Sequence, residues 1–109
     1  MRVLINYRVR PDQVEPSLAL LRDVYADLEA RRPDGLRYAT FQLDDGVTFL
    51  AYIESEGDAV AAPHHRLESF QRYRAGLEEL CDRPPSVTVI REVGSYRFGG
   101  EPVTGARDQ

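Results

Sequence analysis

Hydrophobic and polar residues alternate in four short segments of the chain, whereas in two longer segments the hydrophobic residues recur at every third or fourth position. Alternation predicts strands, because successive side chains of a strand point to opposite faces, and a spacing of three or four predicts helices. The predicted strands cover residues 2–9, 36–43, 47–54 and 86–93. The apolar stripe of the first helix consists of Val14, Leu18, Leu21, Tyr25 and Leu28.

Residues that favour helix ends and turns separate these segments. Asp12 with Glu15 is typical of a capping box, and Pro16 places the start of the first helix close by. The sequence RRPDG is typical of a helix end, and Asp45-Gly46 is typical of the tight turn in a hairpin. The pattern therefore predicts one long helix followed by a hairpin of two strands.

The second helix is expected over residues 64–82, stopped by Pro84-Pro85. One face of this helix carries Phe70, Tyr73, Leu77 and Leu80. A polar connection precedes it, with one short helical turn expected after Asp58.

In chain order these segments predict strand, helix, strand, strand, helix and strand, or βαββαβ. Four strands with two helices on one face form a ferredoxin-like α+β sandwich. The length of 109 residues is sufficient for one domain and too short for two. We expect this domain to span residues 1–98, and residues 99–109, which lack apolar periodicity, to form a flexible C-terminal tail.

The predicted strands carry hydrophobic residues on both faces. In the second strand Leu36 and Tyr38 point away from Phe41 and Leu43, and the first strand places Leu4 opposite its main apolar face. A strand that is apolar on both faces is covered on both faces. A second copy of the chain, packed sheet against sheet, provides this cover. The sequence thus predicts a homodimer in which two sheets form a dimeric α/β barrel.

Composition restricts the partners and the location of the protein. The net charge of -4 and the pI near 5.1 disfavour nucleic acid and anionic membranes, because an acidic surface repels phosphate. Cys81 is the only cysteine, which excludes an internal disulfide and fits a reducing cytoplasm. No CxxC, HExxH, GxGxxG or P-loop motif occurs, so we expect no metal and no cofactor.

Four segments of the sequence are informative about more than the fold class. They are RPDQVEPSLALLRDVYADLEARRPDGLRYATFQL with its PDG turn, FLAYIES, HHRLESFQRY with a histidine shortly before a helical aromatic pair, and VTVIREV. Together they resemble the antibiotic-biosynthesis-monooxygenase-like family of dimeric α/β-barrel proteins, over about residues 2–98. The resemblance implies oxidation of aromatic, phenolic or quinol substrates by O2 without metal or flavin. Other members of the family degrade haem or have no known activity.

The resemblance also implies roles for individual residues. It makes His64 the general base, because the family often has a histidine six positions before the first helical aromatic residue, here Phe70. Tyr73 matches the second aromatic residue of the pair, and Asn6 matches an asparagine on the first strand of haem-degrading relatives. The chain departs from the family in having no tryptophan, and in having Ser69 where many members place a second histidine.

Each of these residues also has an interpretation that requires no chemistry. His64 and His65 fit an exposed polar helix start after Pro63, and as neighbours on a helix they cannot both face one pocket. Asn6 fits a hydrogen bond at a dimer interface or a strand edge.

The remaining candidates line the predicted pocket or belong elsewhere. Arg74 fits either a clamp for an acidic phenol or carboxylate, or a solvated surface position. Arg91, expected within the last strand, fits either a pocket lining or an ion pair with Glu54 or Glu92 of a partner chain. The aromatic residues line a cavity between sheet and helices in one interpretation and form an ordinary core in the other. These residues are Tyr25, Tyr38, Tyr52, Phe70 and Tyr73.

The sequence therefore predicts a cofactor-independent monooxygenase that acts on a small aromatic, phenolic or quinol-type substrate. His64, Asn6 and Tyr73 are the predicted catalytic residues. A non-catalytic homodimer that binds a small apolar molecule is the first alternative, and a haem-binding or haem-degrading relative is the second.

Overall fold

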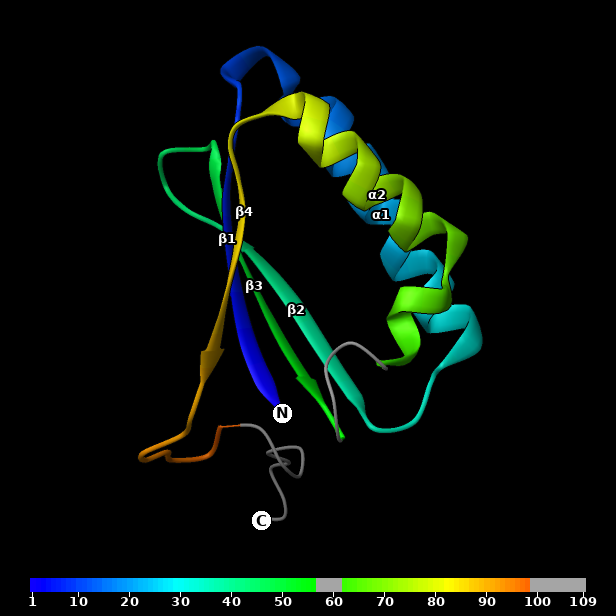
Figure 1. Cartoon of the computed structure of the whole chain (residues 1–109), viewed down its shortest axis with the longest axis vertical. Helices are drawn as coiled ribbons and strands as arrows, with labels where there is room; N and C mark the ends of the chain where they lie inside the picture. The colour runs from blue at the N-terminus through cyan, green and yellow to red at the C-terminus, as the bar shows by residue number, and fades with distance from the viewer. Residues whose placement is uncertain (57–61, 99–109) are drawn as a thin grey trace.

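The computed structural model describes residues 1–56 and 62–98, which contain four strands and two α-helices in the predicted order (Figure 1). The helical turn expected after Asp58 and the tail expected from Gly99 lie outside the described residues. A short 3-10 helix precedes each α-helix. The elements are β1 (Arg2–Val9), η1 (Pro11–Gln13), α1 (Val14–Arg31), β2 (Leu36–Gln42), β3 (Thr48–Ser55), η3 (Pro63–Arg66), α2 (Glu68–Leu80) and β4 (Cys81–Ile90).

The four strands form one antiparallel sheet in the order β2-β3-β1-β4. Both helices lie against one face of this sheet, and the other face carries no helix (Figure 1). This arrangement is the ferredoxin-like α+β sandwich, so the predicted fold class is confirmed. Of the described helices, none has both the length and the apolar character needed to cross a membrane.

Pairing between the strands sets which side chains face the helices. Tyr7 of β1 pairs with Phe49 of β3, and both side chains are buried in the layer between sheet and helices. Asn6, the neighbour of Tyr7, pairs with Leu50 and points to the opposite face. One cluster of buried residues within the core consists of Tyr7, Val9, Val24, Phe49, Leu67, Phe70, Tyr73, Leu77 and Cys81.

The first helix begins near the predicted residue but without the predicted cap. Gln13 is the residue before α1 and makes no side-chain capping bond. Asp12 lies inside η1, one residue too early to cap the helix, so the predicted capping box is not formed. At the other end Arg32 has a left-handed backbone (φ 45°), and its N–H donates to the carbonyl of Leu28 at 2.7 Å.

The hairpin between β2 and β3 has the predicted turn. Gly46 has φ +79°, a value that glycine adopts without strain. The carboxylate of Asp45 accepts hydrogen bonds from the N–H of Val47 at 2.9 Å and from the N–H and hydroxyl of Thr48 at 2.8 and 2.6 Å. These bonds lower the pKa of Asp45 and hold the turn closed.

The second helix differs from its prediction at both ends. The helix expected over residues 64–82 is divided by Leu67, which is extended (φ -78°, ψ 130°), so that α2 begins only at Glu68. The extended residue lets both Leu67 and His64 point into the core, where each is buried. The chain therefore gives up the first turn of the predicted helix, and the burial of these two side chains compensates for that loss.

Pro84 and Pro85 do not stop the helix, because it ends at Leu80 and β4 begins at once. Asn6 and Arg8 of β1 pair with Ser86 and Arg83, so two prolines of β4 stand opposite a single residue of β1. Such a bulge at a sheet edge tolerates proline, which has no N–H to donate. The last strand consequently starts earlier and ends earlier than the predicted 86–93.

Candidate functional site

His64 lies in η3, just before α2. Its side chain is 2% exposed, so it does not belong to an exposed helix start. Pro63 begins η3, and the extended Leu67 ends it, so the chain turns sharply before the helix. This turn directs the imidazole towards the sheet and against Phe70 in the first turn of α2.

Aromatic rings enclose the imidazole of His64. The ring centroids of Phe70 and Tyr38 lie 4.7 and 5.4 Å from the imidazole centroid, both edge-on, and the ring of His65 lies at 4.3 Å. Nδ1 of His64 is buried and has no hydrogen-bond partner among the described residues. An unpartnered buried polar atom costs about 1–3 kcal/mol, which is unusual for a side chain with a purely structural role.

Burial also keeps this imidazole neutral. It lowers the pKa of His64 from 6.5 to about 4, because the charged form loses its hydration, and His65 and Arg74 add smaller unfavourable interactions. At pH 7 the ring is therefore uncharged, and one of its two nitrogens has a lone pair that can accept a proton.

Two buried tyrosine hydroxyls lie in the same layer. The hydroxyls of Tyr7 on β1 and Tyr73 on α2 are hydrogen-bonded to each other, and the ring of Tyr7 stacks on Phe49 at 5.3 Å. Burial raises the pKa of Tyr7 to about 12 and also raises the pKa of Tyr73. Both hydroxyls consequently remain protonated near neutral pH and can donate hydrogen bonds.

Tyr38 and Tyr25 extend this group of rings towards the surface. The ring of Tyr38 lies 5.5 Å from that of Tyr25, on β2 and α1 respectively. The hydroxyl of Tyr25 shares a hydrogen bond of 2.8 Å with Thr40, and burial raises the pKa of both tyrosines. We call the whole group the aromatic cluster; it consists of Tyr7, Tyr25, Tyr38, Phe49, His64, Phe70 and Tyr73.

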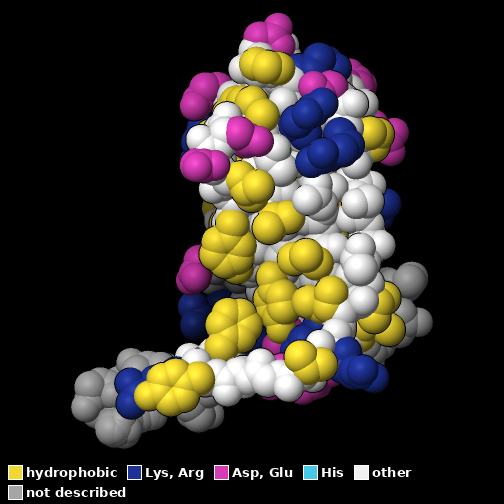
Figure 2. All heavy atoms as spheres, turned by 90° about the vertical axis from the view of Figure 1, so that its left-hand side faces the viewer, with side chains coloured by type: hydrophobic (Ala, Val, Ile, Leu, Met, Phe, Trp, Pro, Cys, Tyr) yellow, Lys and Arg dark blue, Asp and Glu magenta, His cyan; other side chains and the backbone are white. Residues whose placement is uncertain are grey.

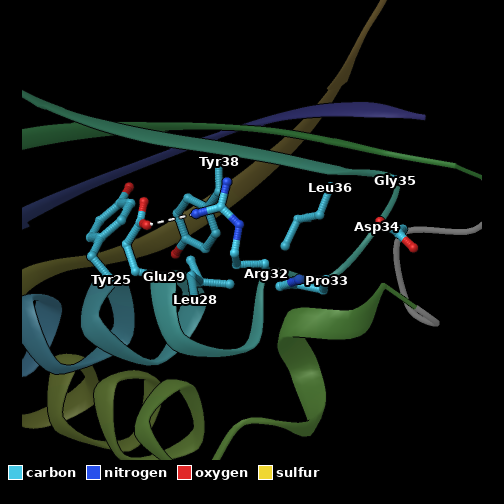
Figure 3. Close-up of a pocket in the computed structure, with 9 residues that line it drawn as sticks. All are labelled: Tyr25, Leu28, Glu29, Arg32, Pro33, Asp34, Gly35, Leu36 and Tyr38. Atoms are coloured by element: carbon cyan, nitrogen blue, oxygen red, sulfur yellow. Dashed lines mark hydrogen bonds and ion pairs between the residues drawn. The ribbon is translucent and has the colours of Figure 1, made fainter.

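A pocket of about 420 Å³ opens beside the aromatic cluster, between the end of α1 and the start of β2 (Figure 3). We call it the Tyr38 pocket. Glu29 and Arg32 both line it and form an ion pair of 3.0 Å, drawn as the dashed line in Figure 3. Tyr38 lines this pocket and also packs against His64, so its ring separates the pocket from the imidazole.

The structure brings several predicted site residues together and leaves others apart. The residues that meet in the aromatic cluster are His64, Tyr73, Phe70, Tyr25 and Tyr38. The predicted residues that lie elsewhere are Asn6, Tyr52, Arg74 and Arg91.

Asn6 and Tyr52 lie on the open face of the sheet, opposite the helices. Oδ1 of Asn6 accepts a hydrogen bond from Arg83 at 2.9 Å. The hydroxyl of Tyr52 accepts one from Arg2 at 3.0 Å and donates one to Glu54 at 3.1 Å. The sheet thus lies between Asn6 and His64 of the same chain, because Asn6 and Tyr7 alternate along β1.

The two predicted arginines are exposed. Arg74 is exposed on α2. Its positive charge contributes to the lowered pKa of His64. Arg91 was predicted to lie within the last strand, but β4 ends at Ile90, so Arg91 follows the strand. β4 ends there because Ile90 pairs with Arg2, the first residue of β1, so Arg91 has no partner residue in that strand.

Tyr7 and the ion pair of Glu29 with Arg32 were not predicted to belong to the site. A signal for Tyr7 exists in the sequence, since it lies on the helix-facing side of a strand, where a buried hydroxyl needs a partner. The partner is Tyr73, which is distant in sequence and close only after folding. Nothing in the local pattern indicates that Glu29 and Arg32 line a pocket.

The described residues provide no open haem site. The imidazole of His64 is packed against Phe70 and Tyr38, so an axially bound iron would reach it only after these rings move. Asn6 lies on the other face of the sheet. Within residues 1–56 and 62–98, no three His, Cys, Asp or Glu side chains form a cluster that can hold a metal ion.

Comparisons with known proteins agree with this fold. No family model matches the chain, and no curated protein is significantly similar to it in sequence. Among solved structures, Rv0793 of Mycobacterium tuberculosis has 26% identity and a TM-score of 0.70, over 86% of this chain and 95% of that protein. An antibiotic biosynthesis monooxygenase has 20% identity and a TM-score of 0.67, over 85% and 98%. PA3566 of Pseudomonas aeruginosa has 21% identity and a TM-score of 0.68, over 85% and 93%. The chain therefore has the fold of the antibiotic biosynthesis monooxygenases.

Proposed function

We propose that the protein is a cofactor-independent monooxygenase that oxidises a small aromatic, phenolic or quinol-type molecule with O2. The observation that carries this proposal is His64, whose neutral imidazole is buried among aromatic rings with an unpartnered nitrogen. The similarity in fold to an antibiotic biosynthesis monooxygenase supports the same class of reaction. An apolar surrounding of this kind suits an aromatic substrate and excludes water from a reactive anion.

In the proposed reaction His64 removes one proton from a carbon or hydroxyl activated by the aromatic ring. The resulting anion passes one electron to O2, and the two radicals combine to form a carbon–oxygen bond. The protonated His64 returns its proton to the peroxide anion so formed, and loss of water from the resulting hydroperoxide completes the reaction, which for an activated methylene group is CH2 + O2 → C=O + H2O. One oxygen atom enters the product, the other leaves as water, and the substrate supplies all four electrons.

Tyr73 is the second residue of the proposed site. Its hydroxyl and that of Tyr7 are protonated and buried, so a rotation of either one presents a hydrogen-bond donor to a substrate oxyanion. Asn6 has no place in this mechanism, because it points to the other face of the sheet. The Tyr38 pocket is the proposed entrance, and displacement of the Tyr38 ring opens the way to His64.

Oxygen uptake in the presence of anthrones and simple quinols tests the proposal. His64→Phe keeps an aromatic ring, somewhat larger than the imidazole, at this position and removes the base, so we expect turnover to fall by about 10²–10⁴-fold. His65→Gln is the comparison: it removes the neighbouring imidazole, which contacts His64 and contributes to its lowered pKa, but leaves the base in place, so turnover should fall far less than in His64→Phe. Unchanged turnover in His64→Phe, with a native circular dichroism spectrum, contradicts the assignment of His64.

A non-catalytic protein that binds a small aromatic molecule is the second candidate. The enclosure of His64 favours it, because a side chain that is 2% exposed meets a substrate only after its neighbours move. Binding of anthrones to the wild-type protein without oxygen uptake, and with the same affinity in His64→Phe, supports this candidate over the enzyme.

We further propose that two copies of the chain pack through the open faces of their sheets. Figure 2 shows hydrophobic side chains gathered over this face. Phe41 is 57% exposed and Leu43 36%; Leu50 of β3 pairs with Phe41, and Leu4 lies on β1, the next strand of the sheet. An apolar sheet face in contact with water is unfavourable, and a two-fold dimer covers both copies at once. Light scattering checks this proposal, with twice the chain mass of 12.4 kDa as the expected result.

A cytoplasmic location also belongs to this proposal. Cys81 is a free, buried cysteine, and the net charge of -4 suits neither nucleic acid nor an anionic membrane as a partner. Cell fractionation checks the location, and recovery of the protein with the membrane fraction contradicts it.

A further inference from the structure

The end of α1 and the start of α2 lie side by side at one end of the helical layer (Figure 1). A second pocket is lined there by residues of α1, η3 and α2. Its volume is about 680 Å³, and it shares only Pro33 with the Tyr38 pocket. We call it the arginine pocket. Its lining residues are Asp27, Arg31, Pro33, Pro63, Arg66, Leu67, Glu68, Ser69 and Arg72.

Three arginines from three different elements line this pocket. Arg31 belongs to the last turn of α1, Arg66 to η3 and Arg72 to α2. The lining also contains Asp27 and Glu68, so three arginines and two acidic residues give it a net charge of +1, whereas the whole chain carries -4. A concave site with an excess of positive charge attracts negatively charged ligands.

The acidic residues of the pocket leave two of these arginines available. The carboxylate of Asp27 accepts a hydrogen bond from the hydroxyl of Ser69 at 2.7 Å and lies 3.8 Å from Nε of Arg31. Glu68 precedes Arg72 by four residues, the spacing at which helical ion pairs form, but the two do not pair. Within residues 1–56 and 62–98, neither Arg66 nor Arg72 forms an ion pair.

The rest of the lining is apolar. Pro33 and Pro63 are half-buried, and Leu67 is 8% exposed. The volume of the pocket greatly exceeds the roughly 30 Å³ that one water molecule occupies, and falls in the range of about 300–1,000 Å³ typical of small-molecule sites. A ligand that fits both parts of the lining has an apolar body and a negatively charged group.

We propose that the arginine pocket binds a small organic anion, with its carboxylate or phosphate held by Arg66 and Arg72 and its apolar part against Pro33, Pro63 and Leu67. The planar guanidinium group donates two parallel hydrogen bonds to either type of oxyanion. Arg66 and His64 belong to the same turn, η3. An anion bound by Arg66 therefore also restrains the backbone that carries His64. The site requires no turnover and stands independently of the proposed oxygenase activity.

Isothermal titration with phenyl phosphate and with benzoate tests the site in the whole chain, and benzyl alcohol serves as the uncharged probe. We expect at least one anion to bind and the alcohol not to bind. Binding of phenyl phosphate alone identifies a phosphate site, and binding of benzoate identifies a carboxylate site. The double substitution Arg66→Gln and Arg72→Gln should weaken binding about tenfold or more, because hydrogen bonds to charged groups are the stronger class.

Arg22→Gln is the control for charge, since it removes one positive charge, half of what the double substitution removes, from an exposed position of α1 outside the pocket. This variant should bind the anion with nearly wild-type affinity. Three results overturn the proposal: neither anion binds, benzyl alcohol binds as tightly as benzoate, or Arg22→Gln weakens binding as much as the double substitution does. Both arginines are exposed, so their replacement by glutamine is compatible with a folded chain, which thermal unfolding verifies.

Discussion

His64 shows how burial alone changes the chemistry of a side chain. An imidazole in water is partly charged near neutral pH, whereas the imidazole of His64 is neutral because its pKa is about 4. The same surroundings that suit an aromatic substrate therefore keep this imidazole uncharged, so that one of its nitrogens has a free lone pair, and they also make it a weaker base than an imidazole in water. They also link the stability of the fold to pH.

We expect the free energy of unfolding to decrease as the pH falls from about 6.5 to about 4. In this window the unfolded chain holds a proton on His64 and the folded chain does not, so acid favours unfolding. The total decrease in the free energy of unfolding is about 3 kcal/mol and is reached near pH 4, below which His64 is protonated in both the folded and the unfolded chain. Urea unfolding at a series of pH values between 7 and 4 measures it.

His64→Phe provides the comparison for this prediction. It keeps an apolar ring in the cluster and removes the titration, while the carboxylates titrate in both proteins. The difference in unfolding free energy between wild type and variant should therefore change with pH in favour of the variant. Parallel pH profiles for the two proteins would show that His64 is not held neutral by the fold.

At the scale of elements, the hydroxyl pair of Tyr7 and Tyr73 joins the central strand β1 to helix α2. Each hydroxyl is the buried partner of the other, so their energies are strongly coupled. Removing one hydroxyl leaves the other without its partner in an apolar layer, which costs more than removing both.

We expect Tyr7→Phe and Tyr73→Phe each to lower the free energy of unfolding by about 1–3 kcal/mol. The double variant should be no less stable than the worse single variant, because it leaves no unpartnered hydroxyl behind. Chemical denaturation of the four proteins gives the coupling energy directly. Tyr96→Phe serves as the control, since Tyr96 is 81% exposed. Simple additivity of the two single effects would contradict the pairing.

At the scale of the whole molecule, the two faces of the sheet differ in what covers them. The helices cover one face, and hydrophobic side chains remain on the other (Figures 1 and 2). Asn6 and Tyr52 lie on this open face. In the proposed dimer this face is the interface, so Asn6 would be an interface residue. The proposed dimer thus accounts for a residue that the proposed active site does not use.

Phe41→Asp should convert the dimer to a monomer. A buried aromatic side chain at an interface typically contributes about 2 kcal/mol or more, and a two-fold interface contains it twice, so we expect roughly 10³-fold weaker association. Light scattering at micromolar concentration reports the mass. Ala19→Asp, at an exposed position of α1, introduces the same charge away from the sheet and should remain dimeric. A monomeric wild-type protein would refute the proposed assembly.

The sequence by itself determined the order of the elements and the two faces of each strand. Periods of two and of three to four residues follow from local backbone geometry, so they are readable without knowledge of distant contacts. The same holds for the Asp45-Gly46 turn, whose bonds reach no further than Thr48. The fold class and the apolar character of the open face follow from these local patterns.

Only the tertiary structure decided which side chains meet. The start of β4 at Cys81 depends on pairing with β1, which outweighs the local tendency of Pro84 and Pro85 to interrupt a strand. His64 is buried and Asn6 lies on the other side of the sheet because the chain turns at η3 and alternates along β1. Such contacts depend on the packing of elements that are far apart in the chain, and no local sequence pattern predicts that packing.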